Sequence, residues 1–256
     1  MADAPQTPLN PTEGWGVVHL LLRAAPGAEA RPVLDAIAAF TADDPQQVIA
    51  FSVLGGRADL GLMALGPDLD ALDRFVKAVL RGPVEVVDSF VSLTELSEYT
   101  TTEDDERSRL AREGAEDLEG ALAAWRARMA DYHEARLHPR LPRRRMIAFY
   151  PMAKTRLPGA NWYALEFEER KRLMLGHARV GRRYAGRVLQ LITGATGLDD
   201  WEWGVTLLAD DPSAIKSIVY EMRFDEVSAL YGDFGAFWTG LVMDPGDALA
   251  RAGLVI

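Results

Sequence analysis

Hydrophobic and polar positions in the first hundred residues alternate between two periods. Apolar segments typical of strand, helix, strand, strand, helix and strand follow one another at residues 16–22, 28–40, 48–54, 59–65, 68–80 and 84–94. The sequence Gly55-Gly56-Arg57 between the two middle strands predicts a hairpin. Asp68 is placed to cap the second helix, and Gly82-Pro83 is placed to end it. This order predicts a ferredoxin-like βαββαβ unit.

The second half of the chain repeats this topology. The corresponding strands and helices are expected at residues 146–150, 166–184, 188–192, 202–208, 211–222 and 236–242. Pro151 is expected to end the first of these strands, and Asp211-Pro212 to begin the second helix. The two halves show no sequence identity, so the repeat is one of pattern. Two such sheets can pack face to face or curl into a barrel.

A charged segment separates the halves. Leu110, Leu118, Leu122 and Trp125 are spaced as on one helix over residues 98–128, with Leu141-Pro142 as its end. The predicted organisation therefore has four parts. A mobile N-terminal arm covers residues 1–14 and a first ferredoxin-like half residues 15–97. A charged linker helix with a basic loop covers residues 98–144, and a second ferredoxin-like half residues 145–256.

Composition narrows the functional classes. Hydrophobic residues make up 48% and charged residues 26% of the 256 residues, which is typical of a globular protein. The chain has no cysteine, which excludes disulfides and cysteine-ligated metal sites and fits a cytoplasmic location. No apolar run approaches the ~20 residues that a membrane span requires. The net charge of -10 argues against nucleic acid as a partner.

Basic residues nevertheless gather in one stretch of this acidic chain, at Arg136, Arg140, Arg143, Arg144, Arg145, Lys154 and Arg156. A local positive patch can attract an anionic small molecule. The alternative interpretation is a solvated basic loop.

His177 is the candidate metal ligand. On the helix expected over residues 166–184, its neighbours at helical spacing are apolar, so we expect the imidazole to face apolar material. Such a histidine is either a core residue satisfied by one hydrogen bond or an axial ligand to iron. The residues alone leave both interpretations open.

Several motifs between residues 136 and 240 recur together, in this order: YPMAK, NWY, the GH of Gly176-His177, GRRYAGRV, LITG, DDWEWGV, VYEMRFDEVSALYG and the FG of Phe234-Gly235. In these motifs the chain resembles the coproheme decarboxylases, the haem-synthesis branch of the chlorite dismutase-like family. The N-terminal half matches in pattern only. The resemblance implies an α+β fold in which the two ferredoxin-like halves form a dimeric α+β barrel within one chain.

The resemblance also implies a reaction. Members of this branch convert Fe-coproporphyrin III (coproheme), which is both substrate and redox cofactor, to haem b through a three-propionate intermediate, with hydrogen peroxide as oxidant. By analogy the protein would be a cytoplasmic homopentamer that contacts a ferrochelatase transiently. It would bind no nucleic acid and would not span a membrane.

The family pattern assigns catalytic roles to particular residues. His177 corresponds to the proximal iron ligand, and Tyr150 to the tyrosine whose radical takes a hydrogen atom from a propionate. His133 corresponds to a distal histidine that deprotonates bound peroxide, for which a reference pKa near 6.5 is suitable. His138 is its competitor, and His133 is preferred because it lies three residues before Arg136, on the same side of a helix.

The remaining site residues hold or line the porphyrin in the family pattern. Arg136, Lys154, Arg223 and Ser228 correspond to positions that bind the propionates, whose burial without partners would be costly. Met152 and Trp162 are expected to line the pocket, and Trp201 and Trp203 to serve mainly in packing. Gln190 stands where chlorite-decomposing relatives have arginine, which argues against that activity because a neutral amide stabilises a departing anion less well.

The sequence is also compatible with two other functional classes. A non-catalytic haem carrier or sensor would need the iron ligand and the propionate-binding cations but neither Tyr150 nor a distal base. An αβ-barrel oligomer could instead use the basic loop to bind a different anion.

Overall fold

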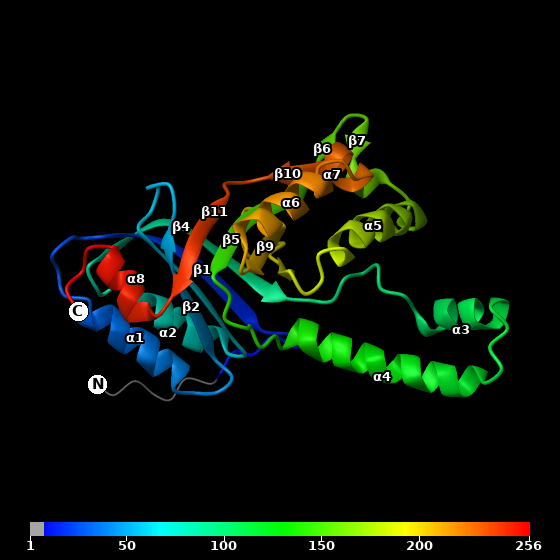
Figure 1. Cartoon of the computed structure of the whole chain (residues 1–256), viewed down its shortest axis with the longest axis horizontal. Helices are drawn as coiled ribbons and strands as arrows, with labels where there is room; N and C mark the ends of the chain where they lie inside the picture. The colour runs from blue at the N-terminus through cyan, green and yellow to red at the C-terminus, as the bar shows by residue number, and fades with distance from the viewer. Residues whose placement is uncertain (1–7) are drawn as a thin grey trace.

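The computed structural model describes residues 8–256, and its N-terminal half has the predicted βαββαβ order (Figure 1). Its elements are β1 (Gly16–Ala24), α1 (Arg31–Thr41), β2 (Gln47–Val53), β3 (Leu60–Gly66), α2 (Leu69–Val79) and β4 (Val84–Thr94). The strands lie in the order β2-β3-β1-β4 and pair antiparallel. Asp68 caps α2 by accepting a hydrogen bond from the backbone N–H of Asp70, as the sequence predicts.

The C-terminal half repeats the arrangement with insertions. Its main elements are β5 (Met146–Lys154), α5 (Phe167–Arg182), β8 (Val188–Gly194), β9 (Trp203–Ala209), α6 (Pro212–Met222) and β11 (Trp238–Met243). The insertions are β6 (Arg156–Leu157), β7 (Ala160–Asn161), a 3₁₀ turn (Trp162–Ala164), α7 (Glu226–Tyr231) and β10 (Gly232–Phe234). The strand order β8-β9-β5-β11 matches that of the first half.

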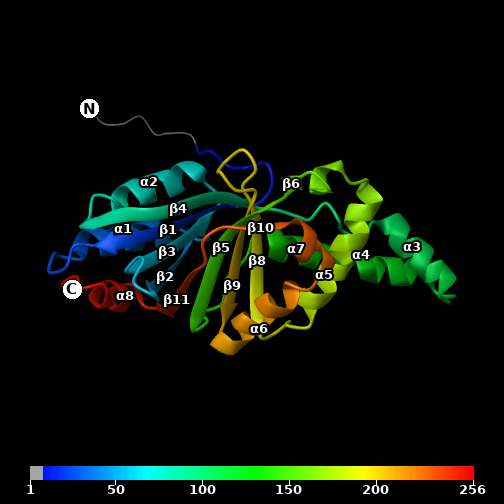
Figure 2. The same ribbon diagram turned by 90° about the horizontal axis from the view of Figure 1, so that it is seen from above.

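The two halves close into one barrel. β11 pairs with β2 and β4 pairs with β8, and both pairings are antiparallel. Figure 2 shows the strands running side by side with helices at both ends of the row. The predicted α+β barrel built from two ferredoxin-like halves is therefore confirmed.

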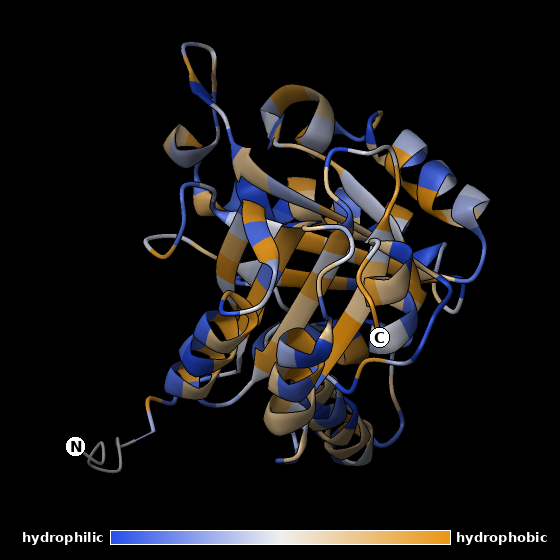
Figure 3. Ribbon diagram, turned by 90° about the vertical axis from the view of Figure 1, so that its left-hand side faces the viewer, coloured by the Kyte–Doolittle hydropathy of each residue, from blue (hydrophilic) through white to orange (hydrophobic). Residues whose placement is uncertain are grey.

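Three apolar layers hold the barrel together. The interior is filled from both halves by side chains such as Val17, Phe51, Phe149 and Trp238. Outside the barrel, α1 and α2 cover the first half, and α6 covers β5, β8 and β9. Figure 3 shows apolar colour along the strands and polar colour on the outer sides of the helices. This distribution is the expected one, because each strand contributes alternate side chains to the two sides of the sheet.

The C-terminal helix α8 (Pro245–Arg251) was not predicted, and it packs on the N-terminal half. Its Ala248 and Leu249 are fully buried against the α1–α2 layer. The following backbone N–H of Val255 donates to the carbonyl of Ala28 at 2.9 Å. Figure 1 shows α8 beside α1. The end of the chain thus adds to the core of the first half, although it belongs to the range predicted for the second.

The prediction of one linker helix is wrong. The segment forms two helices, α3 (Glu103–Arg112) and α4 (Leu118–Leu137), which project from the barrel as a hairpin (Figure 1). Gly114, with a φ of 71°, ends α3 because a left-handed backbone is easy only for glycine. Asp117 then caps α4 by accepting the N–H of Gly120 at 2.8 Å. α4 also ends earlier than predicted, at Leu137.

The prediction that Pro151 ends its strand is also wrong, since β5 continues to Lys154. The carbonyl of Pro151 accepts a hydrogen bond from the N–H of Gly235, which lies between β10 and β11. The proline nitrogen faces the same side, where the neighbouring strand is interrupted. No ladder hydrogen bond is lost there, so the proline is tolerated.

The predicted mobile arm, residues 1–14, lies half outside the described residues, which begin at residue 8. The described part is attached to the barrel: the N–H of Leu9 donates to Asp68, and its carbonyl accepts from Leu69. None of the helices within residues 8–256 has both the length and the apolar character needed to cross a bilayer.

A buried histidine lies in the barrel interior. His19 is 1% exposed, its ring stacks on Phe149 with 3.9 Å between the centroids, and its Nε2 lies 2.9 Å from Thr206 Oγ1. Burial lowers the pKa of His19 to about 3, because the imidazolium would lose its hydration. The histidine is therefore neutral in the folded protein.

This burial predicts a specific acid sensitivity. Between pH 6.5 and about 3 the unfolded chain protonates His19 and the folded protein does not, so the free energy of unfolding falls as the pH is lowered. Urea unfolding at pH 7, 6 and 5 should show a pH dependence that is shallower in His19→Leu, by up to about 1.4 kcal/mol per pH unit. Equal slopes in the two proteins would contradict this account.

Candidate functional site

A cavity of about 660 Å³ lies between the barrel and the helices of the C-terminal half. One wall is the outer face of β5, β8 and β9, and the facing wall is formed by α5 and α6. The volume lies in the range of small-molecule and cofactor sites. All but one of the residues predicted for the site line this cavity, namely Arg136, Tyr150, Met152, Lys154, Trp162, His177, Gln190, Arg223 and Ser228.

The strand β5 positions three of these residues. Ile147 and Phe149 point into the barrel core, and the alternate residues Tyr150, Met152 and Lys154 line the cavity. This alternation is confirmed in β9, where Trp203 and Val205 line the cavity and Leu208 lies in the barrel. Each of these strands thus contributes one side to the barrel core and the other side to the cavity.

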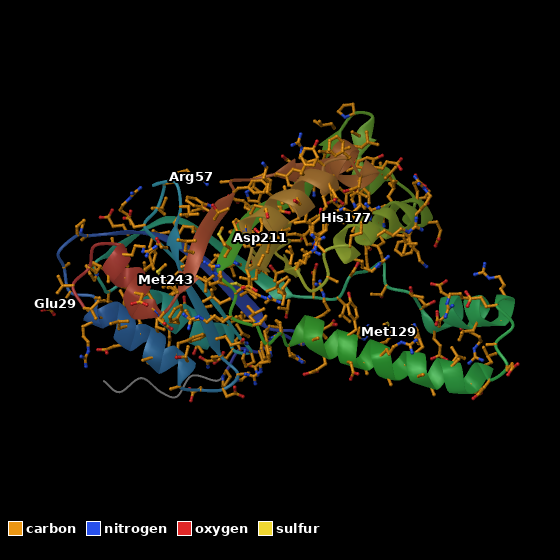
Figure 4. All side chains as sticks on the ribbon, in the orientation of Figure 1. Glu29, Arg57, Met129, His177, Asp211 and Met243 are labelled. Atoms are coloured by element: carbon orange, nitrogen blue, oxygen red, sulfur yellow. The ribbon has the colours of Figure 1, made fainter. Side chains whose placement is uncertain are left out.

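His177, which is labelled in Figure 4, lies on α5 and lines the cavity. Its side chain is 28% exposed, and its Nδ1 lies 3.0 Å from Asp225 Oδ2. A carboxylate accepts hydrogen bonds, so in the neutral imidazole Nδ1 carries the proton and Nε2 the lone pair, and Nε2 has no hydrogen-bond partner among residues 8–256. We expected the imidazole to face apolar material and not solvent. It does line a cavity with apolar side chains, but it is partly exposed and also contacts a carboxylate.

Asp225 was missed by the sequence reasoning, although it lies in one of the quoted motifs. It caps α7 by accepting the N–H of Ser228 at 3.1 Å and the Ser228 hydroxyl at 2.9 Å. Burial raises the pKa of Asp225, but the hydrogen bonds from His177 and Ser228 outweigh it, and the net pKa is lowered. The residue therefore remains an anion that can hold His177 in one orientation. The spacing of Asp225 and Ser228 was the available signal, since it is typical of a helix N-cap.

Tyr150 lies against aromatic rings at the cavity. It is 6% exposed, stacks on Phe237 with 4.3 Å between ring centroids, and has Phe234 at 6.0 Å. Burial raises the pKa of Tyr150 to about 12. The phenol consequently keeps its proton at neutral pH.

Lys154 is a buried cation beside Trp162. It is 8% exposed, and its Nζ lies 5.1 Å from the Trp162 ring centroid. Burial lowers the pKa of Lys154 to about 8, against the opposing effect of Asp225 and Glu202. An anion bound in the cavity would therefore stabilise the protonated form of Lys154 and raise its pKa.

Arg136 and Arg223 supply further positive charge to the cavity. The buried Nε of Arg136 has no hydrogen-bond partner among residues 8–256, which is rare for a buried donor. Arg223 lies over the rings of Tyr220 and Phe224, with its guanidinium carbon 5.5 and 5.9 Å from their centroids. An anionic ligand would satisfy the donor that Arg136 leaves unpaired.

The structure does not place His133 among the residues that line the cavity. It lies on α4 beside Tyr132, one turn before Arg136. The competitor His138 is also absent from the lining, since its Nδ1 lies 2.9 Å from Glu134 and its ring packs near Trp15. Neither histidine is brought to the site in this conformation.

Other predicted residues are distributed as follows. Gln190 lines the cavity but donates its amide N–H to the carbonyl of Gly181 on α5 at 3.2 Å.

Trp201 packs against the barrel core, as predicted, whereas Trp203 lines the cavity. The indole N–H of Trp203 donates to Glu95 at 3.1 Å. Glu95, which the sequence reasoning missed, adds a carboxyl whose pKa is raised by burial.

These residues fit an anionic metalloporphyrin. His177 lines a cavity that also has apolar side chains and three cations, and one of these cations, Arg136, has a buried nitrogen without a partner among the described residues. Within residues 8–256 no group of three or more histidine, aspartate or glutamate side chains could hold a bare metal ion. A single imidazole suits an iron that four porphyrin nitrogens already hold.

Comparison with known proteins agrees with this site. The family model described as chlorite dismutase matches residues 25–243. The chain belongs to the chlorite dismutase family. This match includes β5, α5 and all the cavity strands.

Relatives within the family carry haem-related names. A protein of Staphylococcus saprophyticus named coproheme decarboxylase is 36% identical over 95% of this chain and 96% of its own length. A Halobacterium salinarum protein, named provisionally for haem binding, is 40% identical over 96% of this chain, but the chain spans only 50% of that protein. The solved structure of a haem-binding protein from Thermus thermophilus has a TM-score of 0.77 and 34% identity, and covers 98% of this chain and 99% of its own.

The site predicts unequal losses of stability when two of its charged residues are replaced. Arg136→Met should lower the free energy of unfolding by less than about 0.5 kcal/mol, because the guanidinium nitrogen it removes has no partner. Asp225→Ala should lower it by about 1–3 kcal/mol, because a helix cap and the His177 contact are lost. Urea unfolding of the ligand-free proteins measures both. Equal losses would mean that Arg136 is a structural residue.

Proposed function

We propose that this protein is a coproheme decarboxylase that converts Fe-coproporphyrin III to haem b with hydrogen peroxide. The observation that carries the proposal is that Tyr150, His177 and three cationic side chains line one cavity. The staphylococcal relative supports it, since that protein is named for this reaction and aligns over nearly the full length of both chains.

The chemistry balances for each propionate that reacts. A propionate loses carbon dioxide, two electrons and one proton and becomes a vinyl group. One hydrogen peroxide takes up the two electrons and two protons and becomes two water molecules. Two such rounds convert the four-propionate substrate to haem b through a three-propionate porphyrin.

The chain's residues hold the porphyrin in a defined pose. Bound iron porphyrin supplies the peroxide-dependent oxidation. His177 would ligate the iron through Nε2, while Asp225 keeps the imidazole oriented. Arg136, Lys154 and Arg223 would bind propionates, with the Ser228 hydroxyl beside them. Apolar side chains such as Met152, Trp162 and Val205 would cover the ring.

Tyr150 is proposed to carry the oxidation to the propionate. Its phenol is protonated at neutral pH, so an electron and a proton leave together. The oxidised side chain then takes a hydrogen atom from a propionate methylene and regains its O–H bond. Loss of a second electron from the substrate breaks the bond to the carboxylate and releases carbon dioxide. The rings of Phe234 and Phe237 pack beside the phenol, which is 6% exposed.

Chlorite decomposition is not proposed. Gln190 offers a neutral amide where chlorite-decomposing relatives have arginine, and this amide is already engaged with α5. A neutral group stabilises a departing oxyanion less well than a cation does. The cytoplasmic location, the homopentamer and the transient contact with a ferrochelatase remain predictions from the family resemblance.

A haem carrier or sensor is the second candidate, because two of the compared relatives are named for haem binding. A carrier needs His177 and the cations but not a phenol at the propionates. Mass spectrometry of the bound porphyrin after peroxide addition separates the two functions. A carrier returns coproheme intact, and an enzyme returns haem b.

Tyr150→Phe tests the proposed chemistry. The variant should bind coproheme as the wild type does, because the aromatic packing is kept, but it should release no carbon dioxide after peroxide is added. The measurement is porphyrin mass spectrometry with a parallel Soret titration. A variant that forms haem b at the wild-type rate would remove Tyr150 from the mechanism.

The matched control for this experiment is His177→Ala. It should retain Tyr150 and the cations but lose the iron ligand, so the Soret spectrum of bound coproheme should change. An unchanged spectrum would show that another group ligates the iron.

His133 stays a prediction as the distal base, and a pair of variants tests it. His133→Ala should slow the reaction with peroxide by about 10²-fold or more, the usual contribution of a positioned base. His138→Ala should react at the wild-type rate, because its imidazole contacts Glu134 and Trp15 instead. Equal rates for His133→Ala and the wild type would show that His133 is not the distal base.

A further inference from the structure

One buried carboxylate organises the end of the cavity where Lys154 lies. Glu202, the residue directly before β9, is 7% exposed. Its Oε2 accepts the backbone N–H of Lys154 at 2.9 Å and also the hydroxyl of Tyr163. Its Oε1 accepts a hydrogen bond from the guanidinium of Arg156. A buried carboxylate with this set of donors is held in one position.

The three donors come from one segment of the chain, residues 154–163. This segment leaves β5 at Lys154, turns through β6 and β7, and reaches the 3₁₀ turn that begins with Trp162. Trp162 is 3% exposed, lines the cavity, and lies beside the ammonium of Lys154. By holding both ends of the segment, Glu202 fixes the backbone that presents Lys154 and Trp162.

Glu202 also acts on Lys154 through its charge. The carboxylates near Lys154 are Asp225, which caps α7, and Glu202, which directly precedes β9, and both favour the ammonium form against the effect of burial. Part of the Glu202 charge is offset by Arg156, whose guanidinium lies over the Tyr163 ring at 4.4 Å. Asp225 in turn accepts a hydrogen bond from the His177 imidazole. Lys154 is therefore influenced by two nearby carboxylates, and both favour its ammonium form.

We propose that Glu202 is a positioning residue for substrate carboxylates: it holds the 154–163 segment over the cavity and supplies negative charge near Lys154. This inference rests on the proposed function for the identity of the carboxylate ligand. Its direct test does not, because the state of Lys154 can be measured in the ligand-free protein.

The first measurement is the pH dependence of amine acetylation, followed by peptide mass spectrometry. The chain has four lysines, so each is resolved, and the exposed Lys216 serves as internal reference. The midpoint for Lys154 in the wild type is expected at about 8. In Glu202→Gln, which keeps the size but removes the charge, the midpoint should fall by roughly one pH unit.

Arg156→Gln is the matched variant, and its effect should have the opposite sign. Removing this guanidinium leaves the Glu202 charge less compensated, so the Lys154 midpoint should rise. The shift should be smaller, because the Arg156 side chain is 61% exposed and solvent screens it. A role confined to holding the backbone would not move the two midpoints in opposite directions.

The second measurement is coproheme affinity by Soret titration at two pH values. If the ammonium form binds, Glu202→Gln should bind about eightfold more weakly than the wild type at pH 8.5, and nearly equally at pH 6. The difference arises because both proteins are protonated at Lys154 at pH 6, whereas at pH 8.5 the variant has lost most of its ammonium form.

The outcomes separate the two proposals. An unchanged Lys154 midpoint in Glu202→Gln, or a loss of affinity that is the same at both pH values, would overturn the role of Glu202. If Glu202→Gln does not fold, an unchanged or lowered midpoint in Arg156→Gln would overturn it. Failure of the wild type to bind coproheme would instead overturn the proposed function, and the acetylation result would stand.

Discussion

The two-residue alternation of β5 is the constraint on which the barrel and the cavity both depend. Phe149 and its alternate neighbours fill the barrel, so Tyr150, Met152 and Lys154 must face the opposite side. Pairing with β9 on one side and with β10 and β11 on the other fixes the register of β5. A slip of one residue would bury Lys154 in the barrel and expose core side chains. Correct folding of β5 therefore also places the cavity residues on the correct side of the sheet.

Without a ligand, the cavity holds cationic side chains whose charge or hydrogen bonding is only partly satisfied. Arg136 keeps a buried nitrogen without a partner among the described residues, and burial destabilises the charged form of Lys154. Such features cost stability in isolation, and natural proteins retain them mainly at functional sites. A ligand with several carboxylates would offset these costs. His177 differs from the cations, because Asp225 already satisfies its Nδ1 and leaves only Nε2 for a ligand.

Local patterns in the sequence predicted most of the fold, since apolar periods and caps act over a few residues. They failed where a distant contact decides the structure. Pro151 stays in β5 because the neighbouring strand is interrupted, which the local sequence cannot show. Asp225 lies 48 residues from His177, and Glu202 lies 48 from Lys154, so neither pairing is visible as a local motif. The break at Gly114, in contrast, had a local signal that the charge pattern obscured.

The central claim is that one cavity places an iron porphyrin between His177 and Tyr150. The most direct measurement is a crystal structure of the coproheme complex with the iron located by anomalous scattering. We expect the iron beside His177 Nε2, with the Tyr150 hydroxyl next to a propionate and Lys154 or Arg136 on the carboxylates. An iron away from His177, or a Tyr150 hydroxyl turned away from every propionate, would contradict the account.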